Sequence, residues 1–372
     1  MLRKISLSLL AIASMATATE VTFSGAMSAD VESNFSPSWK QVNSANQDLT
    51  LTTRAQFEEK TAVELRISNY STVKNPLDTN QRIASVVRGV EPGRQAAISD
   101  SASRWGAMHF DGIQFQWEFS RMAKLIVGDL VYSAGQTSYY GYSWAREYGA
   151  IMKENRLRGL GFKLADQGEI YLGAPDANDR AIWGYATYGG SLIKRTDEKL
   201  FLRGLGDLVF KNGGRERRWT LGGEGEYSKA MTNYNYGGKL DFGLRPYAGT
   251  YTYTWLVEPS FSYKKFSLGA TYYQALLAKQ DSSVKLQTDI PEEQFVYVEP
   301  IISVNQKFSV GLSGEWHNPS TSVKDDDYVL ASPTFYLYPA EKMTLTFWQR
   351  NEWETKNAHY SLGLGLSGQV NF

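Results

Sequence analysis

The segment that most constrains the fold is residues 359–372, His-Tyr-Ser-Leu-Gly-Leu-Gly-Leu-Ser-Gly-Gln-Val-Asn-Phe, in which two kinds of side chain alternate. Every second position from Tyr360 to Phe372 is apolar apart from one glycine, and the positions between them are small or polar. A period of two indicates a β-strand, because successive side chains of a pleated backbone point to opposite faces. We therefore predict a strand with one polar face and one apolar face, and the apolar face has an aromatic residue at each end.

An apolar strand face between two aromatic residues is typical of a strand that crosses a lipid bilayer. Lipid would contact the apolar face, water would contact the polar face, and the aromatic residues would lie at the two interfaces. A strand of a soluble β-sandwich is the alternative, but such a strand rarely carries an aromatic residue at both ends. The pattern therefore favours a transmembrane β-barrel.

The composition agrees with a barrel and excludes a bundle of transmembrane helices. The mean hydropathy is −0.38, and after residue 13 there is no apolar run of the roughly 20 residues that a membrane-spanning helix needs. Alternating strands give such a low mean hydropathy because the polar residues of one face offset the apolar residues of the other. The chain is also rich in the aromatic residues of interface girdles and in the glycine of tight turns, with 23 Tyr, 10 Trp, 17 Phe and 33 Gly.

Cysteine content and charge exclude several function classes. The chain has no cysteine, which argues against a disulfide scaffold, a thiolate metal site and a catalytic thiol. Lys+Arg and Asp+Glu both number 39, so there is no net positive charge to attract a polyanion, and nucleic acid is not an expected partner.

The first residues have the features of a secretory signal peptide. Arg3 and Lys4 form a basic region, and residues 5–13 form an apolar run too short to span a membrane. Small residues at Ala16 and Ala18 then provide a cleavage site. We expect residues 1–18 to be removed and residues 19–372 to form one barrel domain.

Hairpins with alternating strands recur along the rest of the chain. In residues 113–119, for example, Ile113, Phe115, Trp117 and Phe119 alternate with polar residues. Seven short turns are predicted, at residues 58–60, 120–122, 166–168, 211–214, 264–265, 305–307 and 339–341. With a first and a last strand they give an all-β antiparallel barrel of about 16 strands, within a range of 14–18. A further hairpin in residues 236–253 remains open.

The longer connections are predicted to form the loops at the opposite, extracellular end of the barrel. They are residues 33–47, 70–104, 133–155, 175–198, 229–250, 279–292, 318–326 and 354–357. Loops of this length are unusual in compact soluble domains. In a barrel with short periplasmic turns they are expected.

Taken together, the signal peptide, the alternating hairpins and the last strand, which ends in Phe372, resemble the Gram-negative outer-membrane porins over the whole mature chain. The resemblance implies an outer-membrane channel for passive diffusion of small hydrophilic solutes and ions. It implies neither an enzymatic activity nor a cofactor. It also implies contact with outer-membrane lipid and lipopolysaccharide, a homotrimer, and recognition of Tyr360 and Phe372 by the barrel-assembly machinery.

In that family the third outer loop usually folds into the lumen as a constriction, and here that loop is residues 133–155. It lacks the Pro-Glu-Phe-Gly-Gly-Asp type of motif that general porins often carry there. Its aromatic residues could offer flat faces to sugars, and its charges could set a field across the pore. The alternative is an outer loop packed on itself. The candidates for the constriction are Tyr139, Tyr140, Tyr142, Trp144, Arg146, Glu147, Lys153, Glu154, Arg156 and Arg158.

The polar face of the predicted strands carries charges of both signs, which predicts only a mild ion preference. In a barrel this face lines the lumen, although a solvated surface would show the same period. The candidates for the lumen wall are Arg54, Arg66, Glu118, Lys163, Arg203, Arg218, Glu224 and Glu258.

Three alternatives to a general diffusion channel remain open. The first is a channel selective for sugars or oligosaccharides that uses the tyrosine-rich loop. The second is an outer-membrane barrel hydrolase, but the chain's His109, His317 and His359 lie on different predicted strands and match no catalytic motif. The third is a structural or adhesive barrel. Asp325–Asp327 could bind calcium, but an exposed loop tip explains it better, so we expect no metal site.

Overall fold

The computed structural model describes residues 20–35, 41–74, 108–137, 151–165, 167–174, 181–211, 216–247, 250–277, 294–318, 327–355 and 359–372. They form 18 β-strands: β1 (Glu20–Phe35), β2 (Gln41–Glu58), β3 (Thr61–Lys74), β4 (Met108–Ser120), β5 (Ala123–Ala134), β6 (Met152–Leu164), β7 (Gly168–Ala174), β8 (Ile182–Lys194), β9 (Glu198–Lys211), β10 (Glu216–Ala230), β11 (Tyr234–Tyr247), β12 (Thr250–Tyr263), β13 (Phe266–Leu277), β14 (Gln294–Asn305), β15 (Phe308–Asn318), β16 (Tyr328–Ala340), β17 (Met343–Glu354) and β18 (His359–Asn371). No helix occurs among these residues, so this part of the chain holds no helical membrane span.

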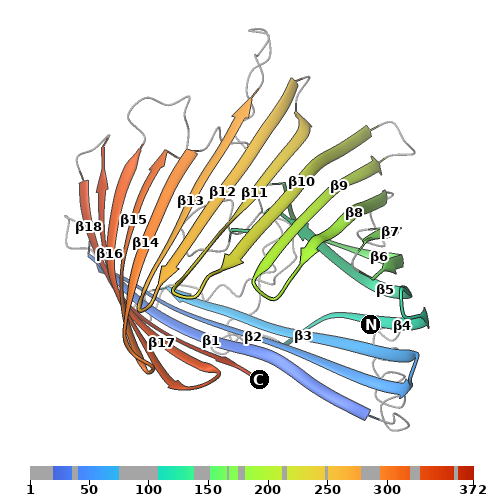
Figure 1. The fold of residues 1–372 in the computed structure, drawn as a ribbon, viewed down its shortest axis with the longest axis horizontal. Coiled ribbons are helices and arrows are strands. Elements are labelled where there is room, and N and C mark those ends of the chain that lie inside the picture. Colours follow the sequence, from blue (N-terminus) through green and yellow to red (C-terminus); the bar gives the residue numbers. More distant parts are fainter. Residues whose placement is uncertain are drawn as a thin grey trace.

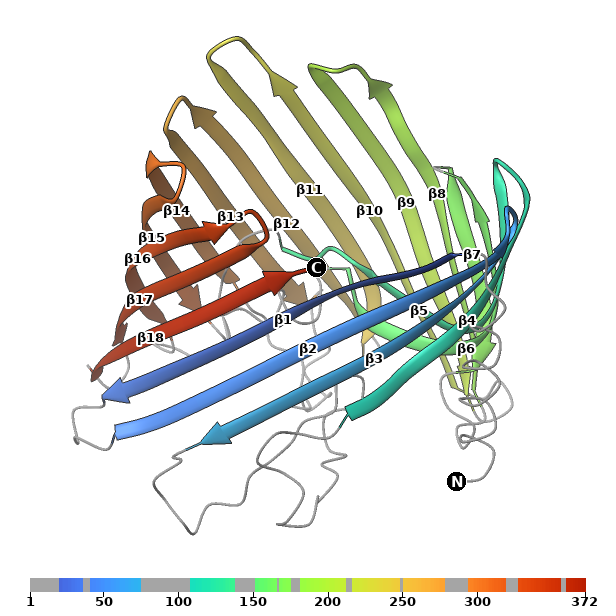
Figure 2. The ribbon, with the colours of Figure 1, turned by 90° about the horizontal axis from the view of Figure 1, so that it is seen from below.

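The strands form one closed antiparallel ring. Each strand pairs with its neighbours in sequence, and β1 pairs with both β2 and β18. The seam between the first and last strands ends in two hydrogen bonds, since the backbone N–H groups of Gly25 and Phe372 each donate to the other residue's carbonyl oxygen at 3.0 Å. Figures 1 and 2 show the strands surrounding a common interior, with the carboxy-terminal end beside β1. The barrel prediction is confirmed.

The strand count of about 16 is too low, and 18 lies at the upper end of the expected range. Two strands were assigned to loops: β8 lies within the predicted loop 175–198, and β11 lies within the predicted loop 229–250. The hairpin left open in residues 236–253 is present, formed by β11 and β12. The turns that follow β8 and β10, at residues 195–197 and 231–233, contain no glycine. Five of the seven predicted turns contain none either, so the missing glycine does not explain the two omissions. The prediction missed β8 because Trp183 and Tyr185 occupy inner-face positions where polar residues were expected.

The two ends of the barrel differ in their connections, and we name them the turn end and the loop end. Short turns join β2 to β3, β4 to β5 and each following even strand to the next odd one at the turn end. The remaining connections lie at the loop end. Residues 211–214 were predicted to be a turn of the first kind, but they join β9 to β10 at the loop end. The missed strand β8 is the reason, because it reverses the chain direction once more.

The two faces of the wall differ in polarity. Large apolar side chains are exposed on the outer face of nearly every strand, for example Phe23 (64%), Leu160 (54%) and Leu312 (54%). On the last strand Tyr360 and Phe372 are 40% and 46% exposed, and their role in assembly stays a prediction. The alternate positions point to the interior, where most polar side chains of the strands lie. The predicted signal peptide lies outside the described residues.

Candidate functional site

All eight residues predicted to line the lumen lie on the inner face of the wall. Glu118 illustrates the assignment, because its sequence neighbours Trp117 (53%) and Phe119 (42%) are exposed on the outer face. The others are Arg54, Arg66, Lys163, Arg203, Arg218, Glu224 and Glu258, each of which alternates with outer-face residues of its strand. Their part in ion or solute passage stays a prediction.

Many of these charges are paired with an opposite charge on the same face. Glu118 lies 2.7 Å from Lys124, and Lys163 lies 2.9 Å from Glu169. The other pairs join Arg203 to Glu224, Arg66 to Glu64, and Arg218 to Asp207. The electric fields of two opposite charges this close largely cancel at longer range, and salt screens what remains beyond the Debye length of about 8 Å. Many charges of the inner wall are therefore neutralised by a neighbour.

Between the middle of the barrel and its loop end, the hairpin of β5 and β6 separates from the neighbouring strands β4 and β7. The ladder between β4 and β5 ends at Gln114↔Gly128, and the ladder between β6 and β7 ends at Arg158↔Ala174. The two strands continue to pair with each other as far as Ala134↔Met152. We name residues 129–137 and 151–157 the inner hairpin. Figure 2 shows the chain after β5 continuing inside the ring of strands.

Two glycines that face each other across β5 and β6 allow the hairpin to bend away. Gly128 and Gly159 are register partners. Gly128 has a φ of +129°, and a Cβ there would lie 2.2 Å from the carbonyl oxygen of Ile113. A Cβ on Gly159 would lie 2.0 Å from the carbonyl oxygen of Leu172. Only glycine fits such a backbone and such close approaches without strain.

Where the hairpin leaves the wall, side chains replace the missing backbone hydrogen bonds. The carboxylate of Asp129 accepts from the backbone N–H of Ile113 at 3.0 Å. The backbone carbonyl oxygen of Asp129 accepts from Arg66 at 3.0 Å and from Gln114 at 2.6 Å. Buried backbone groups almost always find such partners, so Asp129 secures the edge from which β5 turns inward.

The inner hairpin packs on the inner face of the wall through apolar side chains. Tyr132 stacks on Tyr185 of β8 with ring centroids 4.0 Å apart. The buried cluster contains Ile126, Leu130, Tyr132, Ala134, Ile151, Met152, Leu157, Tyr171, Ala181, Trp183, Tyr185, Leu205 and Val209. Its four buried Leu, Ile and Met side chains from the inner hairpin, Leu130, Ile151, Met152 and Leu157, each stabilise by roughly 1.5–3 kcal/mol, which gives a gross gain of roughly 6–12 kcal/mol.

The tip of the inner hairpin is held by polar contacts with β10, β11 and β12. The backbone N–H of Gly135 donates to Glu224 at 2.9 Å, and the hydroxyl of Thr137 donates to Glu258 at 2.5 Å. Lys239 donates to the carbonyl oxygen of Gln136. These contacts join residues that are 89 to 121 positions apart in sequence. Both described ends of the third loop therefore lie within the barrel, where they narrow its interior.

The candidates for the constriction have different outcomes. Tyr139, Tyr140, Tyr142, Trp144, Arg146 and Glu147 lie outside the described residues, and only the backbones of Lys153 and Glu154 are described, in β6. Arg156 is on the face of the inner hairpin opposite the buried Leu157. Arg158 has the strand parity of the outer-face Leu160, with a side chain 71% exposed and 2.7 Å from Asp129. Alternation therefore places Arg158 at the base of the inner hairpin, and its part in a constriction stays a prediction.

Sequence analysis missed the apolar residues of the inner wall. Trp183 and Tyr185 lie in the segment taken for a loop, and Leu205 and Val209 lie on the face expected to be polar. One signal was available: in residues 200–210 apolar side chains occupy both parities of the strand. A strand that is apolar on both faces is shielded from water on both. Here lipid would cover the outer face, and the inner hairpin covers the inner face.

Comparisons with known proteins support the fold. No family model matches the chain, and no curated protein matches it. Solved structures do: OccAB1 of Acinetobacter baumannii has a TM-score of 0.58 at 8% identity and covers 96% of this chain and 98% of its own. OpdQ of Pseudomonas aeruginosa has a TM-score of 0.57 at 8% identity, with 95% and 99% covered. A BenF-like porin of Pseudomonas fluorescens Pf-5 has a TM-score of 0.51 at 10% identity, with 96% and 100% covered. The chain has the fold of the outer-membrane porins.

Proposed function

We propose that this chain forms a water-filled channel in the outer membrane of a Gram-negative bacterium, through which small hydrophilic solutes and ions diffuse passively. One observation carries the proposal: a closed ring of 18 strands has an apolar outer face and a polar, ion-paired inner face, and its own hairpin narrows the interior. Apolar side chains exposed to this extent are stable against lipid and not against water.

The porin resemblance supports the same function. A BenF-like porin shares the fold over nearly the whole of both chains, and a fold by itself does not specify a solute. Further proposals follow for the surroundings of the barrel. Lipid and lipopolysaccharide would contact the outer face, the barrel-assembly machinery would insert the chain, and three copies would associate.

A liposome-swelling assay tests the channel. Folded protein is reconstituted into vesicles, and the rate of swelling is measured in sugars and amino acids of increasing size. We expect swelling in small solutes and a rate that falls steeply with solute size, because the inner hairpin narrows the lumen. Vesicles that contain folded protein but swell no faster than empty vesicles would refute the proposal.

A further inference from the structure

A basin of small side chains occupies the inner face of β10–β14 near the turn end. It holds a volume of about 450 Å³. Two adjacent rows of the sheet form its floor. The first row runs through Ser228, Gly237, Ser260, Gly269 and Glu299, which are successive register partners across five strands. The second runs through Ala230, Asn235, Ser262, Ser267 and Ile301.

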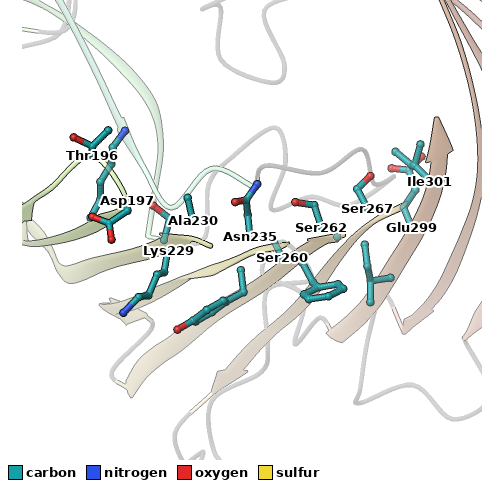
Figure 3. A pocket seen from close by; sticks show the side chains of 16 residues that line it. Thr196, Asp197, Lys229, Ala230, Asn235, Ser260, Ser262, Ser267, Glu299 and Ile301 are labelled. Carbon is teal, nitrogen blue, oxygen red and sulfur yellow. The ribbon is translucent and has the colours of Figure 1, made fainter. Parts of the chain in front are cut away.

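Polar side chains line one end of the basin, and one charged and one apolar side chain line the other. Figure 3 shows Asn235, Ser262 and Ser267 on one side of the sheet, with Thr196 and Asp197 beyond one end of the floor and Glu299 and Ile301 at the other. Bulky side chains of the same strands, such as Tyr236 and Phe261, alternate with these positions and belong to the outer face. The concavity therefore exists because the inward positions are small.

The basin lies directly beyond the narrowed part of the barrel. The tip of the inner hairpin contacts Lys239 and Glu258, which are register partners in β11 and β12. The next inward-facing pair toward the turn end is Gly237 and Ser260, in the first row of the floor. A solute that passes the hairpin toward the turn end therefore meets the basin next.

The chemistry of the basin suits a ligand that both donates and accepts hydrogen bonds. Its serine hydroxyls and the Asn235 amide can each do both. Glu299 is only 7% exposed, and its carboxylate is held by the hydroxyls of Tyr297 at 2.9 Å and of Tyr336. A carboxylate accepts about four hydrogen bonds in all, so Glu299 presents an oriented acceptor to the floor.

Charge and polarity narrow the class of ligand. Asp197 and Glu299 are balanced by Lys199 and Lys229 in the lining of the basin, so its formal charges favour neither an anionic nor a cationic ligand. An apolar ligand would remove water from the hydroxyls without replacing its hydrogen bonds. We propose that the basin binds neutral polyhydroxylated solutes, such as sugars and polyols, as they leave the narrowed part of the channel. The passage of these solutes rests on the proposed function, whereas their binding to the basin can be measured without it.

Saturation-transfer NMR tests the binding, with the folded barrel in an amine-oxide detergent that has no sugar headgroup. Maltotriose and sorbitol are the probes, and a polyethylene glycol of similar size is the control solute because it lacks the hydroxyl array. We expect transfer to both hydroxylated probes and little to the glycol. Absence of transfer to maltotriose and sorbitol, or equal transfer to the glycol, would overturn the proposal.

Matched variants locate the site. Ser260→Ala with Ser262→Ala removes two floor hydroxyls without adding volume, and we expect the Kd for maltotriose to rise about fivefold or more. Ser24→Ala with Ser28→Ala removes two inner-face hydroxyls of β1, outside the basin, and should leave the Kd unchanged. An unchanged Kd in the first variant, or equal weakening in both, would overturn the basin as the site.

Swelling assays on the same preparations separate this inference from the proposed function. Swelling by a channel that binds neither probe contradicts the basin and leaves the channel intact. Binding by a folded barrel that does not support swelling contradicts the channel and leaves the basin intact. Heat-modifiable migration on gels confirms that each variant is folded before it is measured.

Discussion

At the scale of single residues, the period of two predicts which face a side chain takes but not which partner it meets. Alternation depends on the local backbone alone, so the inner-face position of Arg66 and Glu258 follows from the sequence. Their contacts do not. Arg66 donates to a carbonyl oxygen 63 residues away, and Glu258 accepts from Thr137, 121 residues away. Such pairs depend on strand register and on the bend of the inner hairpin, which short sequence windows do not encode.

The assignment of faces gives a prediction for β18. Leu364 is 46% exposed on the outer face, so Leu364→Arg places a charge against lipid and should cost about 2–4 kcal/mol near the bilayer midplane. Ser367→Arg, on the inner face of the same strand, should cost much less. Urea titrations of folding into lipid vesicles measure both. Equal midpoints for the two variants would mean that the faces have been exchanged.

At the scale of elements, strands with clear alternation were predictable, whereas β8 was missed and β11 was covered only by the hairpin left open in residues 236–253. In β8 the aromatic residues Trp183 and Tyr185 point inward, where they pack against the inner hairpin. The strand therefore lacks the polar inner face that marks its neighbours. The inner hairpin was expected only from the family resemblance, because its bend depends on the close approach of Gly128 and Gly159 to the carbonyl oxygens of neighbouring strands, which the sequence does not reveal.

The glycine at the base of the inner hairpin can be tested by adding one methyl group. Gly128→Ala forces a side chain into a φ of +129° and brings a Cβ to 2.2 Å from a carbonyl oxygen, so we expect destabilisation by about 1–3 kcal/mol. Gly314→Ala is the matched control, since a Cβ there meets no heavy atom within 4 Å. Unfolding midpoints in urea are the measurement. If both variants unfold at the wild-type midpoint, the base of the hairpin is not strained as described.

The polar anchors of the hairpin tip should govern its motion more than the stability of the barrel. Glu224→Ala with Glu258→Ala removes the acceptors of Gly135 and Thr137. Each hydrogen bond to a charged group contributes about 1.5–3 kcal/mol, which is less than the gross apolar gain that holds the hairpin's base. We therefore expect a folded barrel whose open-channel current is larger and noisier in single-channel recordings.

A control for the anchors removes the same charge elsewhere. Glu118→Ala with Glu169→Ala also takes two carboxylates from the inner face, and it leaves Lys124 and Lys163 without these ion-pair partners. Neither carboxylate contacts the hairpin tip in the described contacts, so the current noise should stay at the wild-type level. An equal rise in noise in both double variants would attribute the effect to charge and not to the anchors.

At the scale of the whole molecule, closure decides whether the ring is a barrel at all. An open sheet would expose the edge groups of β1 and β18 to hydrocarbon, where no water can satisfy them. The two backbone hydrogen bonds between Gly25 and Phe372 end this seam, and the Phe372 ring covers Gly25. The barrel class could be predicted from the sequence because most strands repeat its signal. The strand count could not, because one weak strand changes it.

Deleting Phe372 tests the seam. The deletion removes two backbone hydrogen bonds and the ring contact, and we expect a lower melting temperature in the heat-modifiability assay. Phe372→Ala keeps both hydrogen bonds, so it should fall between the wild type and the deletion. A deletion variant with the wild-type melting temperature would show that the seam does not depend on its last residue pair.

Single-channel recording in a planar lipid bilayer tests the central claim most directly. If the closed ring is a water-filled channel narrowed by its own hairpin, the folded protein will produce uniform, long-lived conductance steps. Because its inner-wall charges are paired, the reversal potential in a salt gradient should indicate only a mild ion preference. A folded protein that inserts into the bilayer but gives no conductance steps would contradict the account.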